Sequence, residues 1–173
     1  MNKKVLSLVH AAVIAALYVV LTMLANSLGL ANYAVQVRFS ESLTILPFFT
    51  PAAIPGLFIG CLLSNILTGC MPLDVLFGSL ATLLGAMGTY YLCGRAKASS
   101  QTGSSKVWLA PLSPILSNTL IVPFVLAYVY KFEGSIPYFM ATVALGEIIS
   151  CGMLGIILLK SLQKYRKYLF PQK

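Results

Sequence analysis

The sequence predicts an all-α integral membrane protein with six transmembrane helices and both termini in the cytoplasm. Composition is the first observation: 58% of the 173 residues are hydrophobic, only 9% are charged, and the mean hydropathy is +0.88. A soluble domain with an ordinary polar surface does not reach such values. The second observation is that several apolar runs have the ~20 residues that a helix needs to cross a bilayer. The third is the uneven distribution of basic residues between the ends of these runs.

Four apolar runs each fit one crossing: residues 5–26, 73–93, 107–130 and 136–159. A lysine pair precedes the first run and no small-residue cleavage site follows it, which favours a membrane anchor over a cleaved signal peptide. The longest polar gap, residues 94–106, is too short to fold alone. We therefore expect residues 1–173 to form a single membrane domain.

The stretch from residue 36 to residue 69 determines the number of crossings. As one straight helix, residues 41–68 would rise about 42 Å, beyond the ~30 Å hydrocarbon core. Pro47, Pro51 and Pro55 also interrupt it, because each proline removes a backbone donor and clashes with the preceding turn. The sequence therefore predicts two short helices, residues 40–49 and 54–68, or a re-entrant pair.

Basic residues indicate how these segments are oriented. If residues 41–68 turn back, one side of the membrane carries most of the lysines and arginines, and the other carries only Arg38 and Lys131. Since Lys and Arg concentrate in cytoplasmic loops, this favours a multi-pass protein of the cell membrane with both termini inside. The basic tail, residues 160–173, is expected to anchor on anionic lipid. The cytoplasmic set is Lys3, Lys4, Arg95, Lys97, Lys106, Lys160, Lys164, Arg166, Lys167 and Lys173.

Several chemistries lack their parts in this sequence. His10 is the only histidine, so neither a histidine metal cluster nor a Ser–His nucleophile system can form. The GxxxxGK[ST] motif that binds nucleotide phosphates is absent, and the cysteines have no CxxC spacing. The basic residues form no patch with interleaved aromatics, which argues against nucleic-acid binding. We therefore predict no enzymatic activity, no cofactor and no metal.

Polar side chains from several segments converge on the outer half or the middle of the predicted bundle. Glu147 is the first candidate, because an ionisable group inside the bilayer costs ~2.5 kcal/mol or more unless it has a partner or a cavity. A small polar ligand that enters from outside fits this pattern. The predicted binding residues are Glu41, Asn65, Asp74, Asn118 and Glu147, with Tyr33 and Tyr128 as stacking or hydrogen-bonding walls.

Structural interpretations of the same residues stay open at this point. Glu41 lies three residues after Arg38, a spacing that suits a salt bridge. Asp74 opens a predicted helix and suits an N-terminal cap. Asn65 and Asn118 suit hydrogen bonds between membrane helices.

Small residues mark faces where helices approach closely. The first segment carries Ala11 and Ala15 on one face and Ala12 and Ala16 on the next. We expect the GxxxG pair within residues 54–68 to serve internal packing. An external partner for residues 5–26 is the alternative use of the alanines.

The run QVRFSESLTILPFFTPAAIPGLFIGCLLSN (residues 36–65), continued by LDVLFGSLATLLGA (residues 73–86), resembles the QueT (queuosine precursor transporter) family. The likeness extends to AAVIAALYVVLT, PLSPILSNTLIVP and GEIISCGMLG, and so covers most of the chain. These proteins are substrate-binding S components of energy-coupling-factor (ECF) transporters. The resemblance implies an S-component-like bundle of six helices. It also implies capture of a substrate outside and docking on a T component, with two ATPase subunits driving the cycle.

The resemblance implies where ligand and partner are bound. The alanine face of the first helix meets the T component in this type of family, and the chain offers both alanine registers. Tyr33, Gln36 and Arg38 fall in the first external loop, which closes over the ligand in S components. The implied ligand is queuine or another deazaguanine precursor of queuosine. An S component for another vitamin, or a structural membrane subunit without a ligand, is the alternative.

The chemistry of such a ligand suggests individual roles. A deazaguanine has a guanidine-like edge whose donors a carboxylate accepts in pairs, and some precursors add an amine. We predict Glu147 on the guanidine-like edge and Glu41 or Asp74 on the amine. Asn118 and Asn65 would orient the ring, and a tyrosine would stack on it.

The predicted orientation can be tested by thiol labelling. Cysteines introduced at Ser100 and at Lys173 should both resist a membrane-impermeant thiol reagent added to intact cells, because both lie on the cytoplasmic side. Reaction only after the cells are permeabilised is the expected control result. Labelling of either position in intact cells contradicts the orientation.

Overall fold

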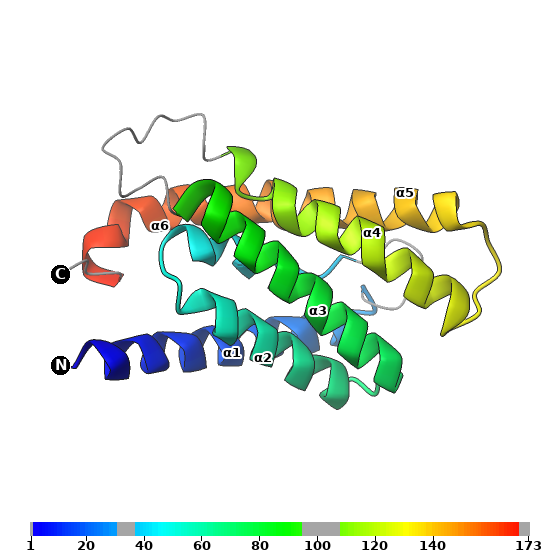
Figure 1. The fold of residues 1–173 in the computed structure, drawn as a ribbon, viewed down its shortest axis with the longest axis horizontal. Coiled ribbons are helices and arrows are strands. Elements are labelled where there is room, and N and C mark those ends of the chain that lie inside the picture. Colours follow the sequence, from blue (N-terminus) through cyan, green and yellow to red (C-terminus); the bar gives the residue numbers. More distant parts are fainter. Residues whose placement is uncertain (1, 31–36, 95–107, 170–173) are drawn as a thin grey trace.

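The computed structural model describes residues 2–30, 37–94 and 108–169. Every regular element within these ranges is a helix (Figure 1). In chain order they are α1 (Lys3–Ser27), the 3₁₀ helix η1 (Phe39–Phe48), α2 (Ala53–Leu67), α3 (Pro72–Thr89), the short π-helix η2 (Tyr90–Gly94), α4 (Leu112–Tyr128), α5 (Ile136–Glu147), the π-helix η5 (Ile148–Leu154) and α6 (Gly155–Leu169).

Most helices begin and end within a few residues of the predicted ranges, but α4 is shorter than the predicted range 107–130 and the last helix is longer than predicted. α5, η5 and α6 follow one another without a break, so the helix predicted over residues 136–159 continues to Leu169 through most of the basic tail. Within the described residues, three helices are long and apolar enough to cross a membrane: Lys4–Ser27, Pro72–Cys93 and Ile136–Arg166. α2 and α4 are apolar but shorter. The number of crossings and their direction stay predictions.

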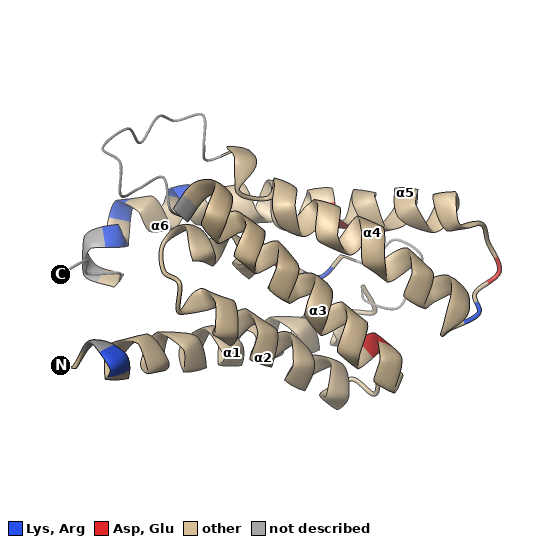
Figure 2. Ribbon diagram, in the orientation of Figure 1, with Lys and Arg blue, Asp and Glu red and all other residues tan. Residues whose placement is uncertain are grey.

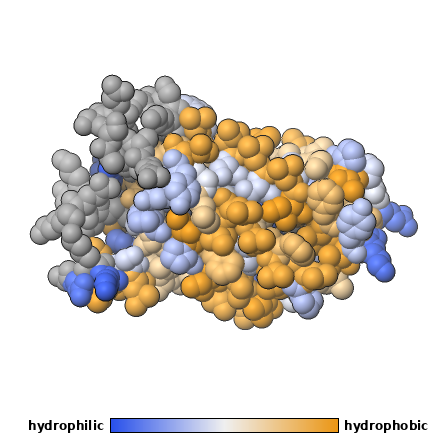
Figure 3. All heavy atoms as spheres, in the orientation of Figure 1, coloured by the Kyte–Doolittle hydropathy of each residue, from blue (hydrophilic) through white to orange (hydrophobic). Residues whose placement is uncertain are grey.

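Charged and hydrophobic residues occupy different parts of the bundle along its length. The two termini lie at the same end of the bundle (Figure 1). Lys and Arg gather at that end on α1 and α6, whereas Lys131 and Glu133 belong to the turn between α4 and α5 at the other end (Figure 2). Hydrophobic residues cover the middle of the face shown in Figure 3. Such an apolar belt between two hydrophilic ends is what a membrane protein needs.

The predicted hairpin is present, but its first arm is unusual. The chain turns back at residues 49–52 between η1 and α2, as the prolines predicted. η1 is a 3₁₀ helix of 10 residues, although such helices rarely exceed one turn. Residues 40–48 are all buried, and η1 packs against α1, α2, α3, α6 and η5. The segment predicted as a second transmembrane helix is therefore an internal helix, shielded by the others along its length.

Glycines end two of the helices. Gly29 and Gly69 have φ values of 73° and 75°, the left-handed conformation that favours glycine. In both places the next amide closes the helix: Leu30 donates to the Ala25 carbonyl and Cys70 to the Asn65 carbonyl. These closures stop α1 and α2, and Pro72 starts α3 in its first turn.

α1 and α2 touch through small residues. A Cβ atom on Gly56 would lie 2.6 Å from the Ala11 carbonyl oxygen, and one on Gly60 would lie 2.7 Å from Tyr18 Cβ. The GxxxG pair therefore serves internal packing, as expected. The same contacts distinguish the two alanine registers: Ala15 is buried against α2 and Ala11 is half-buried. Ala12 and Ala16 are exposed.

This contact makes Gly60→Ala a test of the α1–α2 packing. The added methyl group should destabilise the protein by about 1–3 kcal/mol, because Tyr18 and the α1 backbone leave no room for it. Thermal unfolding of the purified protein would measure the loss. Gly152→Ala is the matched control, since its Cβ would approach nothing closer than Ile148 Cγ2 at 3.8 Å. Equal unfolding temperatures for the two variants would contradict the packing.

Candidate functional site

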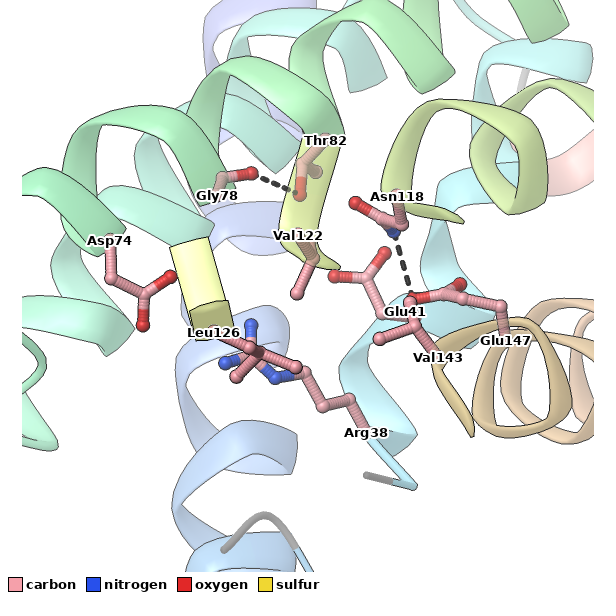
Figure 4. A pocket seen from close by; sticks show the side chains of 10 residues that line it. All are labelled: Arg38, Glu41, Asp74, Gly78, Thr82, Asn118, Val122, Leu126, Val143 and Glu147. Atoms are coloured by element: carbon pink, nitrogen blue, oxygen red, sulfur yellow. Dashed lines mark hydrogen bonds between the residues drawn. The ribbon is translucent and has the colours of Figure 1, made fainter. Parts of the chain in front are cut away.

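A polar pocket lies inside the apolar bundle, beside the start of η1 (Figure 4). The space between its walls is about 510 Å³ with the open mouth included. Only about 30 Å³ of it admits the centre of a water molecule, so a ring-sized ligand requires the walls to move apart. The lining residues are Arg38, Glu41, Asp74, Gly78, Thr82, Asn118, Val122, Leu126, Val143 and Glu147.

Glu41 is the most deeply buried acid of the pocket, at 1% exposure. The hydroxyl of Tyr18, on α1, donates a hydrogen bond to Glu41 Oε1. The other oxygen, Oε2, is buried without a hydrogen-bond partner. Because burying an unpaired polar atom costs free energy, an oxygen left in this state inside a pocket indicates a place for a ligand donor.

Arg38 precedes the first turn of η1 and reaches into the same pocket (Figure 4). Its backbone amide donates to Ser150 Oγ over 3.2 Å, which ties the start of η1 to η5. Its side-chain Nε is buried without a partner. Among the described residues no ion pair joins Arg38 to Glu41, so the salt bridge that their spacing suits is not formed.

Glu147 is held on both of its oxygens. Asn118 Nδ2 donates to Oε1 over 2.9 Å, and the thiol of Cys151 donates to Oε2 over 3.0 Å. Cys151 also lies 3.3 Å from the Glu41 carbonyl oxygen. The π-helix η5 carries this thiol, and a wide turn of this kind frequently marks a functional site. Glu147 is therefore paired within the protein, unlike Glu41.

In the described part of the chain, one cluster of side chains consists of residue types that can bind a metal ion. Ligand atoms of Glu41, Glu147 and Cys151 all lie within 4.8 Å of one another, and all three residues are buried. The hydrogen bonds of the thiol and of Glu147 already join two of these residues. The absence of a resident metal stays a prediction.

Asp74 closes the other side of the pocket. It lies in the first turn of α3, whose N-cap is Met71, so Asp74 is not the cap that its position suits. The hydroxyl of Tyr130 donates to Asp74 Oδ2 over 2.7 Å and accepts the Met71 amide over 3.3 Å. These bonds tie the end of α4 to the start of α3.

The structure brings together five of the predicted binding residues: Arg38, Glu41, Asp74, Asn118 and Glu147. Asn65 lies outside the lining; it is buried behind Gly78, whose Cβ would lie 3.2 Å from Asn65 Nδ2, and it donates weakly to Cys61 Sγ over 3.6 Å. Tyr33 and Gln36 are outside the described residues. Binding roles for all of these side chains stay predictions.

Tyr128, predicted as an aromatic wall, does not line this pocket. It is 70% exposed and stacks on Phe124 at the surface of the bundle. Helical geometry explains this, because Tyr128 follows Leu120 and Phe124 at four-residue intervals on the outer face. Asn118, Val122 and Leu126 follow the same interval on the inner face that lines the pocket.

Sequence reasoning missed Tyr18, Thr82 and Cys151. Thr82 lines the pocket, and its hydroxyl donates to the Gly78 carbonyl over 3.2 Å. A tyrosine in the middle of the first apolar segment is a signal that could have found Tyr18, since a buried hydroxyl needs a partner. Cys151 carried no such signal, because a buried thiol also packs as a small apolar group.

Comparison with known proteins adds to this geometry. The chain matches the QueT transporter family over residues 8–164. This chain belongs to the QueT transporter family. A relative named Queuosine precursor transporter QueT, from Lactococcus lactis subsp. cremoris (strain MG1363), is 30% identical over 169 residues, covering 94% of this chain and 95% of the relative. No solved structure matches the chain.

Membership of the QueT family decides the class of function. The family consists of transporters, so the chain is a transport protein and no enzyme, as predicted. The apolar helices agree with a membrane protein. In a QueT family member, a polar pocket inside an apolar bundle is the natural candidate for the substrate site.

Proposed function

We propose that this chain is the substrate-capture (S) component of an ECF-type importer in the cell membrane. It binds a queuosine precursor or a related deazapurine from outside. It then delivers the ligand through a T component with which two ATPase subunits are associated. Six membrane segments with both termini in the cytoplasm complete the proposal.

The observation that carries this proposal is the polar pocket. Three carboxyl side chains and one guanidinium line it, in a chain with only four acidic residues. A membrane protein tolerates such a concentration of ionisable groups where they serve a function, because each costs free energy in an apolar surrounding. A deazaguanine presents several N–H donors and one carbonyl, which suits a wall rich in carboxyl oxygens with a single arginine.

The exposed face of α1 supports docking on a T component. Ala12 and Ala16 lie side by side on the outer surface, one turn apart, and leave a smooth strip on which another helix can pack closely. Ala11 and Ala15 are occupied by α2. The proposed docking register is therefore Ala12–Ala16, one of the two that the sequence left open.

Binding of a queuosine precursor to the purified protein tests the ligand. Isothermal titration with a 7-deazaguanine precursor should give saturable binding, and mass spectrometry should find a deazapurine in protein purified from cells that contain one. Glu147→Gln should weaken binding by about 1 kcal/mol or more, because glutamine offers one acceptor oxygen to the two donors on Asn118 and Cys151.

Tyr128→Phe is the control for this titration, since Tyr128 lies on the outer surface. An unchanged dissociation constant for Glu147→Gln would remove Glu147 from the site. Co-purification of another vitamin would favour an S component for that vitamin. Absence of any ligand, with no binding of candidates, would favour a structural subunit.

Large side chains on the exposed alanines test the docking. Ala12→Trp and Ala16→Trp should prevent co-purification with the T component while ligand binding persists, because each indole fills the strip on which the partner helix would pack. Leu17→Trp is the matched control, an exposed position on another side of α1. Normal complex formation by both alanine variants would place the docking surface elsewhere.

A further inference from the structure

The pocket contains one buried acceptor and one buried donor that the protein itself does not use. Glu41 Oε2 and Arg38 Nε both lack a hydrogen-bond partner. Unpaired buried groups are rare in proteins, and each one calls for an explanation. The two residues that carry these atoms lie at the two ends of one turn, because the Glu41 amide donates to the Arg38 carbonyl over 3.1 Å.

The geometry of η1 explains why both groups serve one pocket. A 3₁₀ helix has three residues per turn, so side chains three positions apart lie on the same side, about 6 Å apart along the axis. Arg38 is the N-cap of η1 and Glu41 lies in its first turn, so the bond from the Glu41 amide to the Arg38 carbonyl keeps the two residues close together. Both side chains line the pocket (Figure 4). Arg38 Nε and Glu41 Oε2 both lack a partner, so a ligand group that enters the pocket could satisfy both.

Neighbouring contacts fix these two side chains. Tyr18 donates to Glu41 Oε1, which leaves only Oε2 for a ligand. Ser150 accepts the Arg38 amide, which holds the start of η1. Glu147, by comparison, already accepts two hydrogen bonds from Asn118 and Cys151.

We propose that Glu41 and Arg38 together recognise a ring edge on which an N–H donor lies beside a carbonyl acceptor, and that Tyr18 is a positioning residue for Glu41. The N–H donates to Glu41 Oε2, and the carbonyl accepts from the Arg38 guanidinium. Lactam rings of the pyrimidinone and guanine type carry this edge. The inference rests on the proposed function for the choice of ligand, and it assigns the ring N–H, which the guanidine-like edge shares with this one, to Glu41 instead of Glu147.

Three related ring compounds show whether binding depends on this edge or on the rest of the ligand. 7-Deazaguanine and 7-deazahypoxanthine share the N–H beside the carbonyl, whereas 7-deazaadenine replaces the pair with a ring nitrogen and an amine. Titration of the purified full-length protein should give dissociation constants within about tenfold for the first two rings. 7-Deazaadenine should bind roughly 100-fold more weakly or worse, since a mismatched polar edge leaves Glu41 and Arg38 unpaired.

Variants test the residues. Glu41→Gln and Arg38→Gln should each reduce the preference for 7-deazahypoxanthine over 7-deazaadenine by about tenfold or more. Tyr18→Phe should reduce it less but measurably, because Glu41 then turns freely. Glu147→Gln should weaken all three rings while the preference persists, and Tyr128→Phe should change neither. The ratio of two dissociation constants does not depend on the folded fraction, so a destabilised variant still gives an answer.

Outcomes distinguish this inference from the proposed function. Equal binding of the three rings by the unmodified protein overturns the inference, as does an unchanged preference in both Glu41→Gln and Arg38→Gln. If deazaguanines do not bind but another lactam ring does, with the same dependence on Glu41 and Arg38, the proposed substrate fails and the edge recognition stands. No binding of any lactam ring overturns both.

Discussion

A bilayer offers no hydrogen bonds to a peptide backbone, and in this molecule that constraint bears most on η1. The segment is a 3₁₀ helix with Pro47 near its end and Pro51 just beyond, so its backbone is less regular than that of an α-helix. Lipid cannot cover such a segment. The surrounding helices cover it instead, and residues 40–48 are buried throughout. The bundle can therefore be understood as a shell of apolar α-helices around one irregular internal helix.

Burial of η1 also creates the pocket. Its polar residues are buried, and most of them find partners on the helices that enclose them. Thr22 donates to Ser40 over 2.8 Å and Tyr18 donates to Glu41, both from α1, while Cys151 approaches Thr44 at 3.3 Å from η5. Arg38 Nε and Glu41 Oε2 find no partner, at the place where the pocket begins. The irregular helix and the unsatisfied groups thus belong to one arrangement.

Much of this was visible in the sequence, for physical reasons. Apolar runs of bilayer length predicted the helices, and the prolines predicted the turn after η1, because both signals act locally along the chain. The convergence of Glu41, Asp74, Asn118 and Glu147 followed from depth and polarity alone, whereas the role of Arg38 was implied by the family resemblance. The depth of a residue in the membrane does not say which way its side chain points from the helix axis. Tyr128 has a suitable depth but faces outward, and Asn65 lies behind Gly78. Nothing in the sequence showed which helix η1 would contact, so the partners of its polar side chains could not be assigned.

The sequence likewise did not show which face of α1 packs against the other helices. The structure shows what lies on each face. In the sequence, the small residues on both faces of α1 suit docking equally well. In the structure, Gly56 and Gly60 pack against Ala11 and Ala15. That contact turns Ala12 and Ala16 outward, and it turns Tyr18 inward at 1% exposure, where its hydroxyl reaches Glu41. α1 therefore presents a small-residue strip on one side and a hydrogen bond to the pocket on the other. Coupling between two sites requires an element whose contacts with both can differ between two states. Fewer than two turns of α1 separate Ala12 from Tyr18, so the strip proposed for docking and the hydrogen bond to Glu41 belong to one short stretch of this helix.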